Sequence, residues 1–117
     1  MVNLRDVEDT MVSELKVSRE EARIYTLLVN KGRMPATRIS EETGLNVDVV
    51  EGVVKDLIVK GTCIEIGREY EALNPRFAIT NIYRMMCFAN NQELRRNKIV
   101  DQLATLLEKP YEDVRTK

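Results

Sequence analysis

Residues 35–60 read PATRISEETGLNVDVVEGVVKDLIVK and predict two helices joined by a tight turn. The first helix, about residues 36–43, ends before Gly44, because glycine readily takes the left-handed conformation that closes a helix. Asn46 is then a favourable N-cap for a second helix that runs to Lys60. Apolar side chains recur on this second helix at the spacing of one buried stripe: Val47, Val50, Val54, Leu57 and Ile58. The pair is either a helix-turn-helix unit or an ordinary helical hairpin inside a bundle.

The next residues, 61–72, change from a helical period to a strand period. Ile64 and Ile66 alternate with a glutamate, and Tyr70 and Ala72 do the same. The dipeptide at 67–68, Gly-Arg, suits a two-residue hairpin turn with glycine at its first central position. A hairpin placed directly after the second helix argues against a plain bundle. We therefore expect a mainly α fold with a small β-hairpin wing, a winged helix-turn-helix domain over residues 17–74.

Two helices are expected before the helix pair at 35–60. Residues 3–16 carry apolar side chains at three- and four-residue spacing, which predicts a leading amphipathic helix within a segment 1–16. Ser18 and Glu21 then form a capping box that opens a more apolar helix ending at Gly32. This second helix should be the central core helix. The leading helix packs either on its own domain or across a dimer.

Residues 75–109 are again helical in pattern. They form either one helix of about 35 residues or two helices folded back on one another at a break near Asn90. Their apolar surface exceeds what a small winged helix can cover, so a second copy of the chain is the expected partner. The alternative is a monomer whose tail helix packs on its own core. The candidate dimer-interface residues are Ile79, Ile82, Tyr83, Met86, Val100, Leu103 and Leu107. Residues 110–117 are expected to form a tail.

Composition limits the class of protein. The chain has 117 residues, of which 44% are hydrophobic and 32% charged, as expected for one soluble globular domain. It has no apolar run long enough to span a membrane and no export leader. The absence of histidine, of a CxxC pair, of a glycine-rich phosphate loop and of a GxSxG motif argues against an enzyme and against a metal or other cofactor. Cys63 and Cys87 are few and far apart, which fits reduced thiols in an intracellular protein.

The formal net charge of −1 gives no global attraction to nucleic acid, so any electrostatic footprint must be local. Residues 74–98 hold five basic side chains and one carboxylate, whereas residues 1–30 hold four basic side chains and six carboxylates. The basic side chains of 74–98 either flank a duplex in a dimer or only solubilise the tail helix.

Four segments in this order resemble the N-terminal winged-helix domain of the archaeal TrmB-like transcription regulators. They are SREEARIYTLLVNKG, ISEETGLN, DLIVKG and YEALNPRFAI, and the last fits the pattern Tyr-x-Ala-x-x-Pro-x-x-Ala through Tyr70, Ala72, Pro75 and Ala78. The resemblance covers about residues 15–80. It implies a winged-helix fold, dimerisation through the last helix, and DNA binding in an archaeal cytoplasm. The chain ends too early to include the sugar-sensing domain of larger members, so sugar-responsive control is not expected.

The second helix, residues 46–60, would read base edges in the major groove. Its outward candidates are Asn46, Asp48, Val49, Glu51 and Lys55. An asparagine can bond adenine, a carboxylate can accept from cytosine, and a valine can contact a thymine methyl. Here the chain departs from the family, which often has basic or small polar residues early in this helix and a tyrosine at the position of Glu51. A carboxylate that finds no base donor is repelled by DNA.

Backbone contacts are expected from helix 36–43 and from the wing at 67–68. Arg33, Thr37 and Arg38 lie near the start of that helix, where its dipole favours an anion, and Arg68 lies at the wing tip. The expected partners are therefore double-stranded DNA and a second copy of the chain. The alternative is a winged-helix protein-interaction module without sequence-specific DNA binding, with Val49 and its acidic neighbours as the contact patch.

Overall fold

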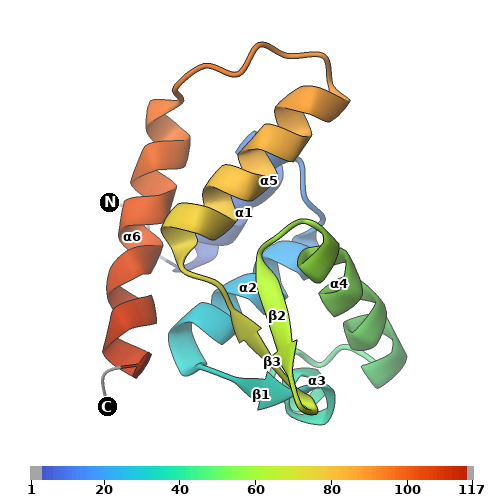
Figure 1. Ribbon diagram of the computed structural model, residues 1–117. Coiled ribbons are helices and arrows are strands. Elements are labelled where there is room, and N and C mark those ends of the chain that lie inside the picture. The colour runs from blue at the N-terminus through green and yellow to red at the C-terminus, as the bar shows by residue number, and fades with distance from the viewer. Residues whose placement is uncertain (1–3, 116–117) are drawn as a thin grey trace.

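The computed structural model describes residues 4–115, with side chains from residue 6 onward, as a mainly helical fold with a small antiparallel sheet (Figure 1). Predictions that concern residues 1–3 and 116–117 lie outside this range. The described elements are α1 (Leu4–Leu15), α2 (Arg19–Lys31), β1 (Met34–Pro35), α3 (Ala36–Thr43), α4 (Val47–Val59), β2 (Cys63–Ile66), β3 (Glu69–Ala72), α5 (Pro75–Ala89) and α6 (Lys98–Arg115). The order of α2 to β3 is compatible with a winged helix.

The predicted pair of helices at 35–60 is confirmed as α3 and α4. Gly44 takes the left-handed conformation with φ 78°, and its N–H donates to the Ser40 carbonyl at 2.8 Å. The Asn46 side chain caps α4 by accepting from the Asp48 N–H at 2.8 Å. At the other end Gly61, with φ 72°, and Thr62 donate back to the last turn of α4, which is the Schellman arrangement.

The sheet has the order β1-β3-β2, and both pairings are antiparallel. The hairpin β2–β3 with its two-residue turn was predicted, whereas β1 was not, because two residues carry no readable period. Cys63 pairs with Ala72 on the buried face, so Ile64 and Ile66 point to the other face and are each 39% exposed. The period of a strand can be read from its sequence, but here the face that is buried could not.

Helix α2 is the centre of the core. It packs against α1, α3, α4, α6 and β3. The Tyr25 side chain on α2 is fully buried, and its hydroxyl donates to the Leu73 carbonyl at 3.1 Å, where the chain leaves the sheet. The predicted capping box is present, since Ser18 accepts from the Glu21 N–H at 3.0 Å and the Glu21 carboxylate accepts from the Ser18 N–H at 2.9 Å.

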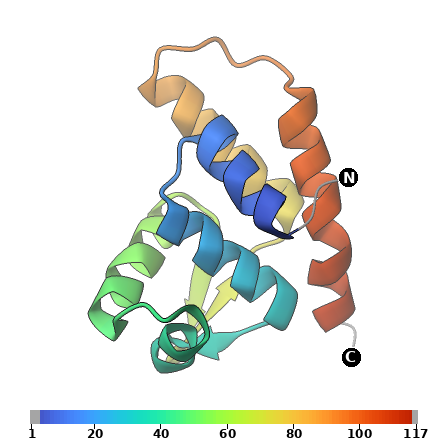
Figure 2. The same ribbon diagram turned by 180° about the vertical axis from the view of Figure 1, so that it is seen from behind.

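The C-terminal region is broken rather than continuous. Helix α5 ends at Ala89, residues 90–97 form a linker, and α6 folds back alongside α5 (Figure 1). Asn97 caps α6 by accepting from the N–H groups of Ile99 and Val100. The segment predicted as a tail, 110–117, is helical as far as residue 115, because α6 continues through Pro110 to Arg115. The leading helix α1 packs on α2, α5 and α6 of the same chain (Figure 2).

The residues proposed for the dimer interface require a correction. Six of them lie in the interior of a single chain: Ile79, Ile82, Met86, Val100, Leu103 and Leu107. Tyr83 is half-buried and its hydroxyl donates to the Arg95 carbonyl of the linker at 2.7 Å. The fold-back of α6 covers, within one chain, the apolar face that the sequence assigned to a second copy. Within residues 4–115, no helix is long and apolar enough to cross a membrane.

Two glycines allow one chemical change to be tested with opposite signs. Gly44→Ala should lower the free energy of unfolding by about 1 kcal/mol, because an L residue is strained at φ 78°. Gly52→Ala should raise it by roughly 0.5–1 kcal/mol, because Gly52 is helical and a Cβ there meets nothing within 4 Å. Urea unfolding of both variants measures the difference. Equal effects of the two substitutions would contradict this assignment of backbone conformations.

A pH dependence follows from the buried Glu21. Burial acts to raise the pKa of this carboxyl, but the Lys60 ammonium and the Ser18 hydrogen bonds outweigh burial and lower it. A lowered folded-state pKa means stability that is present above the unfolded pKa and lost as pH falls through the folded pKa. Glu21→Gln should therefore cost about 1–3 kcal/mol near neutral pH, where the charged hydrogen bond is lost.

The measurement is urea unfolding of wild type and Glu21→Gln from neutral pH down to roughly pH 3. The difference between them should shrink as the pH falls. Glu20→Gln is the matched control, because Glu20 is half-buried and forms no ion pair among residues 6–115. A difference that does not change with pH would show that the Glu21 charge contributes nothing.

Candidate nucleic-acid interface

The predicted base-reading side chains all lie on one open face. Asn46, Asp48, Val49, Glu51 and Lys55 are exposed on α4, while Val50, Val54 and Leu57 are buried on its opposite side. Asn46 is already used as the α4 cap, so its oxygen is shared with the Asp48 N–H. Two-point binding of adenine needs the asparagine oxygen and nitrogen together. The cap therefore competes with base recognition at this position.

Val49 is an exposed apolar side chain near the start of α4, 46% exposed, and Val59 at the end of the helix is 76% exposed. Gly52 beside Val49 leaves open space above the helix backbone. Positions 49 and 52 therefore leave an apolar side chain accessible next to a residue without a side chain.

The predicted backbone contacts are partly occupied within the chain. The Arg33 Nε lies 3.1 Å from a Glu69 oxygen of β3. The Arg38 guanidinium lies 3.7 Å from Glu42, one turn further along α3. Arg68 at the wing tip is exposed and, like Lys55, makes no ion pair within residues 6–115. These two cations are the free positive charges of the face.

The start of α3 leaves backbone donors available. Pro35 stands at the N-cap position and makes no side-chain capping hydrogen bond. The exposed Thr37 lies in this first turn. Uncapped N–H groups and the helix dipole together favour an anion at this end.

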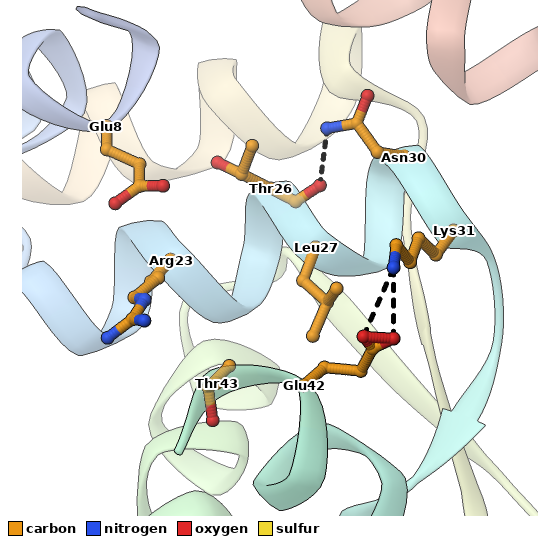
Figure 3. Close-up of a pocket in the computed structure, with 8 residues that line it drawn as sticks. All are labelled: Glu8, Arg23, Thr26, Leu27, Asn30, Lys31, Glu42 and Thr43. Atoms are coloured by element: carbon orange, nitrogen blue, oxygen red, sulfur yellow. Dashed lines mark hydrogen bonds and ion pairs between the residues drawn. The ribbon is translucent and has the colours of Figure 1, made fainter. Parts of the chain in front are cut away.

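A groove of about 170 Å³ lies between α1, α2 and α3 (Figure 3). In it Lys31 of α2 reaches Glu42 of α3 at 3.0 Å, and the Asn30 amide donates to the Thr26 carbonyl. Because Glu42 also faces Arg38, the two basic side chains share one carboxylate. Within the groove, the Lys31–Glu42 ion pair connects α2 to α3, and these charges are paired within the chain.

A cluster that the sequence did not indicate lies between α4 and the wing. Glu51 of α4 and Glu65 of β2 both lie near the Tyr70 hydroxyl of β3. Burial, followed by the charges of Glu65 and Glu51, raises the pKa of Tyr70. These residues are far apart in sequence, so only the packing of the hairpin on α4 brings them together. The cluster places two carboxylates in the angle between helix and wing.

The end of α6 holds the sheet from the other side. The Arg115 guanidinium lies over the Tyr111 ring, 3.6 Å from its centroid. It also donates to the Ala72 carbonyl at 3.3 Å, and its Nε lies 3.5 Å from a Glu71 oxygen. The helix expected to join two copies is therefore fastened to β3 of its own chain.

The basic side chains of residues 74–98 do not join the α4 face. The linker 90–97 lies at the opposite end of the molecule from the hairpin turn (Figures 1 and 2). Arg76 bonds Glu108, Arg95 bonds Glu93, and Arg96 bonds Asp101. Most of this charge is balanced locally.

Metal and thiol chemistry have no support among the residues that the structure describes. No group of three or more His, Cys, Asp or Glu side chains there could hold a metal ion. Cys63 and Cys87 are both buried, and burial raises the pKa of Cys63 to about 12. The Cys63 thiol is therefore protonated at physiological pH.

Comparison with known protein families, with curated proteins and with solved structures finds no match to this chain. The likeness to TrmB-like regulators consequently rests on the quoted sequence segments alone.

Proposed function

We propose that this protein is a dimeric, DNA-binding transcription regulator of the winged-helix type, related to the TrmB-like regulators and acting in the cytoplasm. The observation that supports it most is the open face of α4 beside a hairpin whose tip carries an unpaired Arg68. Helix and hairpin adjoin through β2, which packs on α4. A helix of this kind inserts into the major groove while the neighbouring elements hold the backbone.

In this proposal α4 reads bases and α3 and the wing bind phosphates. Arg38 and Arg33 would exchange a carboxylate for a phosphate oxygen, and Arg68 would reach the backbone from the hairpin turn. Asp48 and Glu51 would accept hydrogen bonds from cytosine amino groups. Where no such donor faces them they repel the duplex, so they lower the affinity for other sequences.

DNA titrations test the phosphate contacts. Wild type should bind duplex DNA at low salt, with an affinity that falls steeply as salt rises, because bound phosphates release counterions. Arg68→Ala should weaken binding to all sequences alike and reduce the slope of log affinity against log salt by about 1. Glu51→Gln should raise the affinity for random fragments. Gel-shift or filter-binding titration over a range of salt measures both effects.

Arg95→Ala is the matched control, because it removes the same charge at the opposite end of the molecule. It should leave the affinity and the salt slope unchanged. Absence of any binding to genomic fragments at low salt would end the DNA hypothesis. An equal loss of DNA affinity in Arg95→Ala and Arg68→Ala would instead contradict the assignment of the binding face to α4 and the hairpin.

A second candidate function is a winged-helix module for protein contact. Charge favours it: residues 33–72 hold five basic side chains and eight carboxylates, and Arg33 and Arg38 are paired. The patch would be Val49 with Asp48 and Glu51, which suits a partner with basic and apolar side chains.

Val49→Asp separates the two candidates. If α4 binds a protein, this change should abolish capture of that protein in a pull-down, because a charge replaces the central apolar contact. Arg38→Ala and Arg68→Ala should leave the capture intact. Loss of capture in the arginine variants alone would instead indicate binding bridged by nucleic acid, which nuclease treatment of the lysate would confirm.

A further inference from the structure

The chain contains two phenylalanines, and both are exposed on α5. Phe77 is 69% exposed and Phe88 is 87% exposed. They are separated by eleven residues, close to three helical turns, so they lie on the same face. Removing such a side chain from water is favourable, so two exposed on one face indicate a surface that is normally covered.

Between them the face continues at coiled-coil spacing. Phe77, Asn81, Arg84 and Phe88 follow one another at intervals of four, three and four residues, and we call them the α5 row. The opposite side of α5 is buried through Ala78, Ile82 and Met86. In Figure 1 α5 lies at the front of the molecule, and the turn after α4 adjoins the row at the half-buried Asn81.

We propose that a second copy of this chain covers the α5 row, with the two α5 helices packed antiparallel about a two-fold axis. In that arrangement Phe77 of each copy meets Phe88 of the other, and Asn81 meets Arg84. A parallel pair would instead set Arg84 against Arg84 and leave like charges facing each other. The row is thus self-complementary in only one direction.

Asn81 and Arg84 form the polar layer of this interface, and Asn81 is already oriented by a hydrogen bond within its own chain. The Asn81 Nδ2 donates to the Gly61 carbonyl at 2.8 Å, which fixes the orientation of the amide. Its Oδ1 is left to accept from the Arg84 guanidinium of the second copy. A fixed acceptor opposite an exposed cation favours one register of the two helices.

The exposed phenylalanines supply part of the area that a stable dimer buries. A phenylalanine side chain buries about 150–250 Å². With the exposed fractions of 69% and 87%, the two side chains would bury roughly 230–390 Å² per copy. A stable interface buries about 800 Å² per partner, and Met85, 44% exposed beside the row, adds to the total. The two aromatic pairs therefore supply roughly 30–50% of that area, one pair on each side of the central Asn81–Arg84 layer.

This interface differs from the one predicted from sequence, whose side chains are mostly buried within one chain. It supplies the homodimer of the proposed function, on which it rests, yet its test needs no DNA. A monomer that binds DNA would overturn this inference and leave DNA binding standing. A dimer that does not bind DNA would support this inference and overturn the proposed DNA binding.

Sedimentation equilibrium of the full chain measures the association. Wild type should be a concentration-dependent dimer, and Phe77→Ala/Phe88→Ala should weaken it on the order of a hundredfold or more. Leu106→Ala is the matched control, because Leu106 is 40% exposed on α6 and outside the row. Circular dichroism should show an unchanged fold, since both phenylalanines are exposed, and Phe88→Ala alone tests the same contact if the double variant does not fold.

Disulfide cross-linking tests the direction of the helices. Under mild oxidation, an equal mixture of Phe77→Cys and Phe88→Cys should give a covalent dimer, while each variant alone and wild type should not. Cross-linking of each variant with itself would indicate a parallel pair and overturn the proposal. A wild type that stays monomeric at all concentrations, or a double alanine variant that dimerises as tightly as wild type, would also overturn it.

Discussion

The burial of α2 is the constraint on which the other elements depend. Its side chains Ile24, Tyr25 and Leu28 are wholly removed from water by helices before and after it in the chain and by the sheet. Because the Tyr25 hydroxyl would lose a hydrogen bond in that interior, its bond to the Leu73 carbonyl fixes where the chain leaves β3 and enters α5. The Glu21–Lys60 pair fixes the end of α4 against the same helix. The angle between α4 and the hairpin follows from these two attachments.

The face formed by α4 and the hairpin is supported by contacts from α6, and two of its arginines are paired with carboxylates of the same chain. Arg115 holds β3 from behind, and Glu42 and Glu69 hold the two arginines nearest to α3. Exposed ion pairs of this kind are worth at most about 1 kcal/mol, so a phosphate can replace the carboxylate at little cost. In the proposed function, this arrangement gives weak attraction to random DNA and a stronger dependence on the bases that meet the carboxylates.

Local signals predicted most of the fold. The boundaries of α3 and α4 follow from Gly44 and Asn46, and the start of α2 follows from the Ser18 capping box, because such motifs act within one turn. Signals were absent or ambiguous elsewhere. Two residues of β1 have no period, Ile64 lies on the outer face of its strand, and Pro110 stands inside a helix rather than after it. The outward residues of α4 were predicted correctly, whereas their ion pairs were not.

The sequence by itself determined the order, type and ends of the main elements, because helix caps, turns and periodicity depend on residues close together in the chain. Tertiary structure alone decided which apolar surface remained uncovered. The fold-back of α6 buried Ile82 and Leu103, which had marked a dimer interface, and left Phe77 and Phe88 exposed instead. The packing of the hairpin on α4 also brought the charges of Glu51 and Glu65 to bear on Tyr70. These outcomes depend on contacts between segments that are far apart in the chain. The periodicity of the sequence shows which helix faces are apolar, but it does not show which of them pack together.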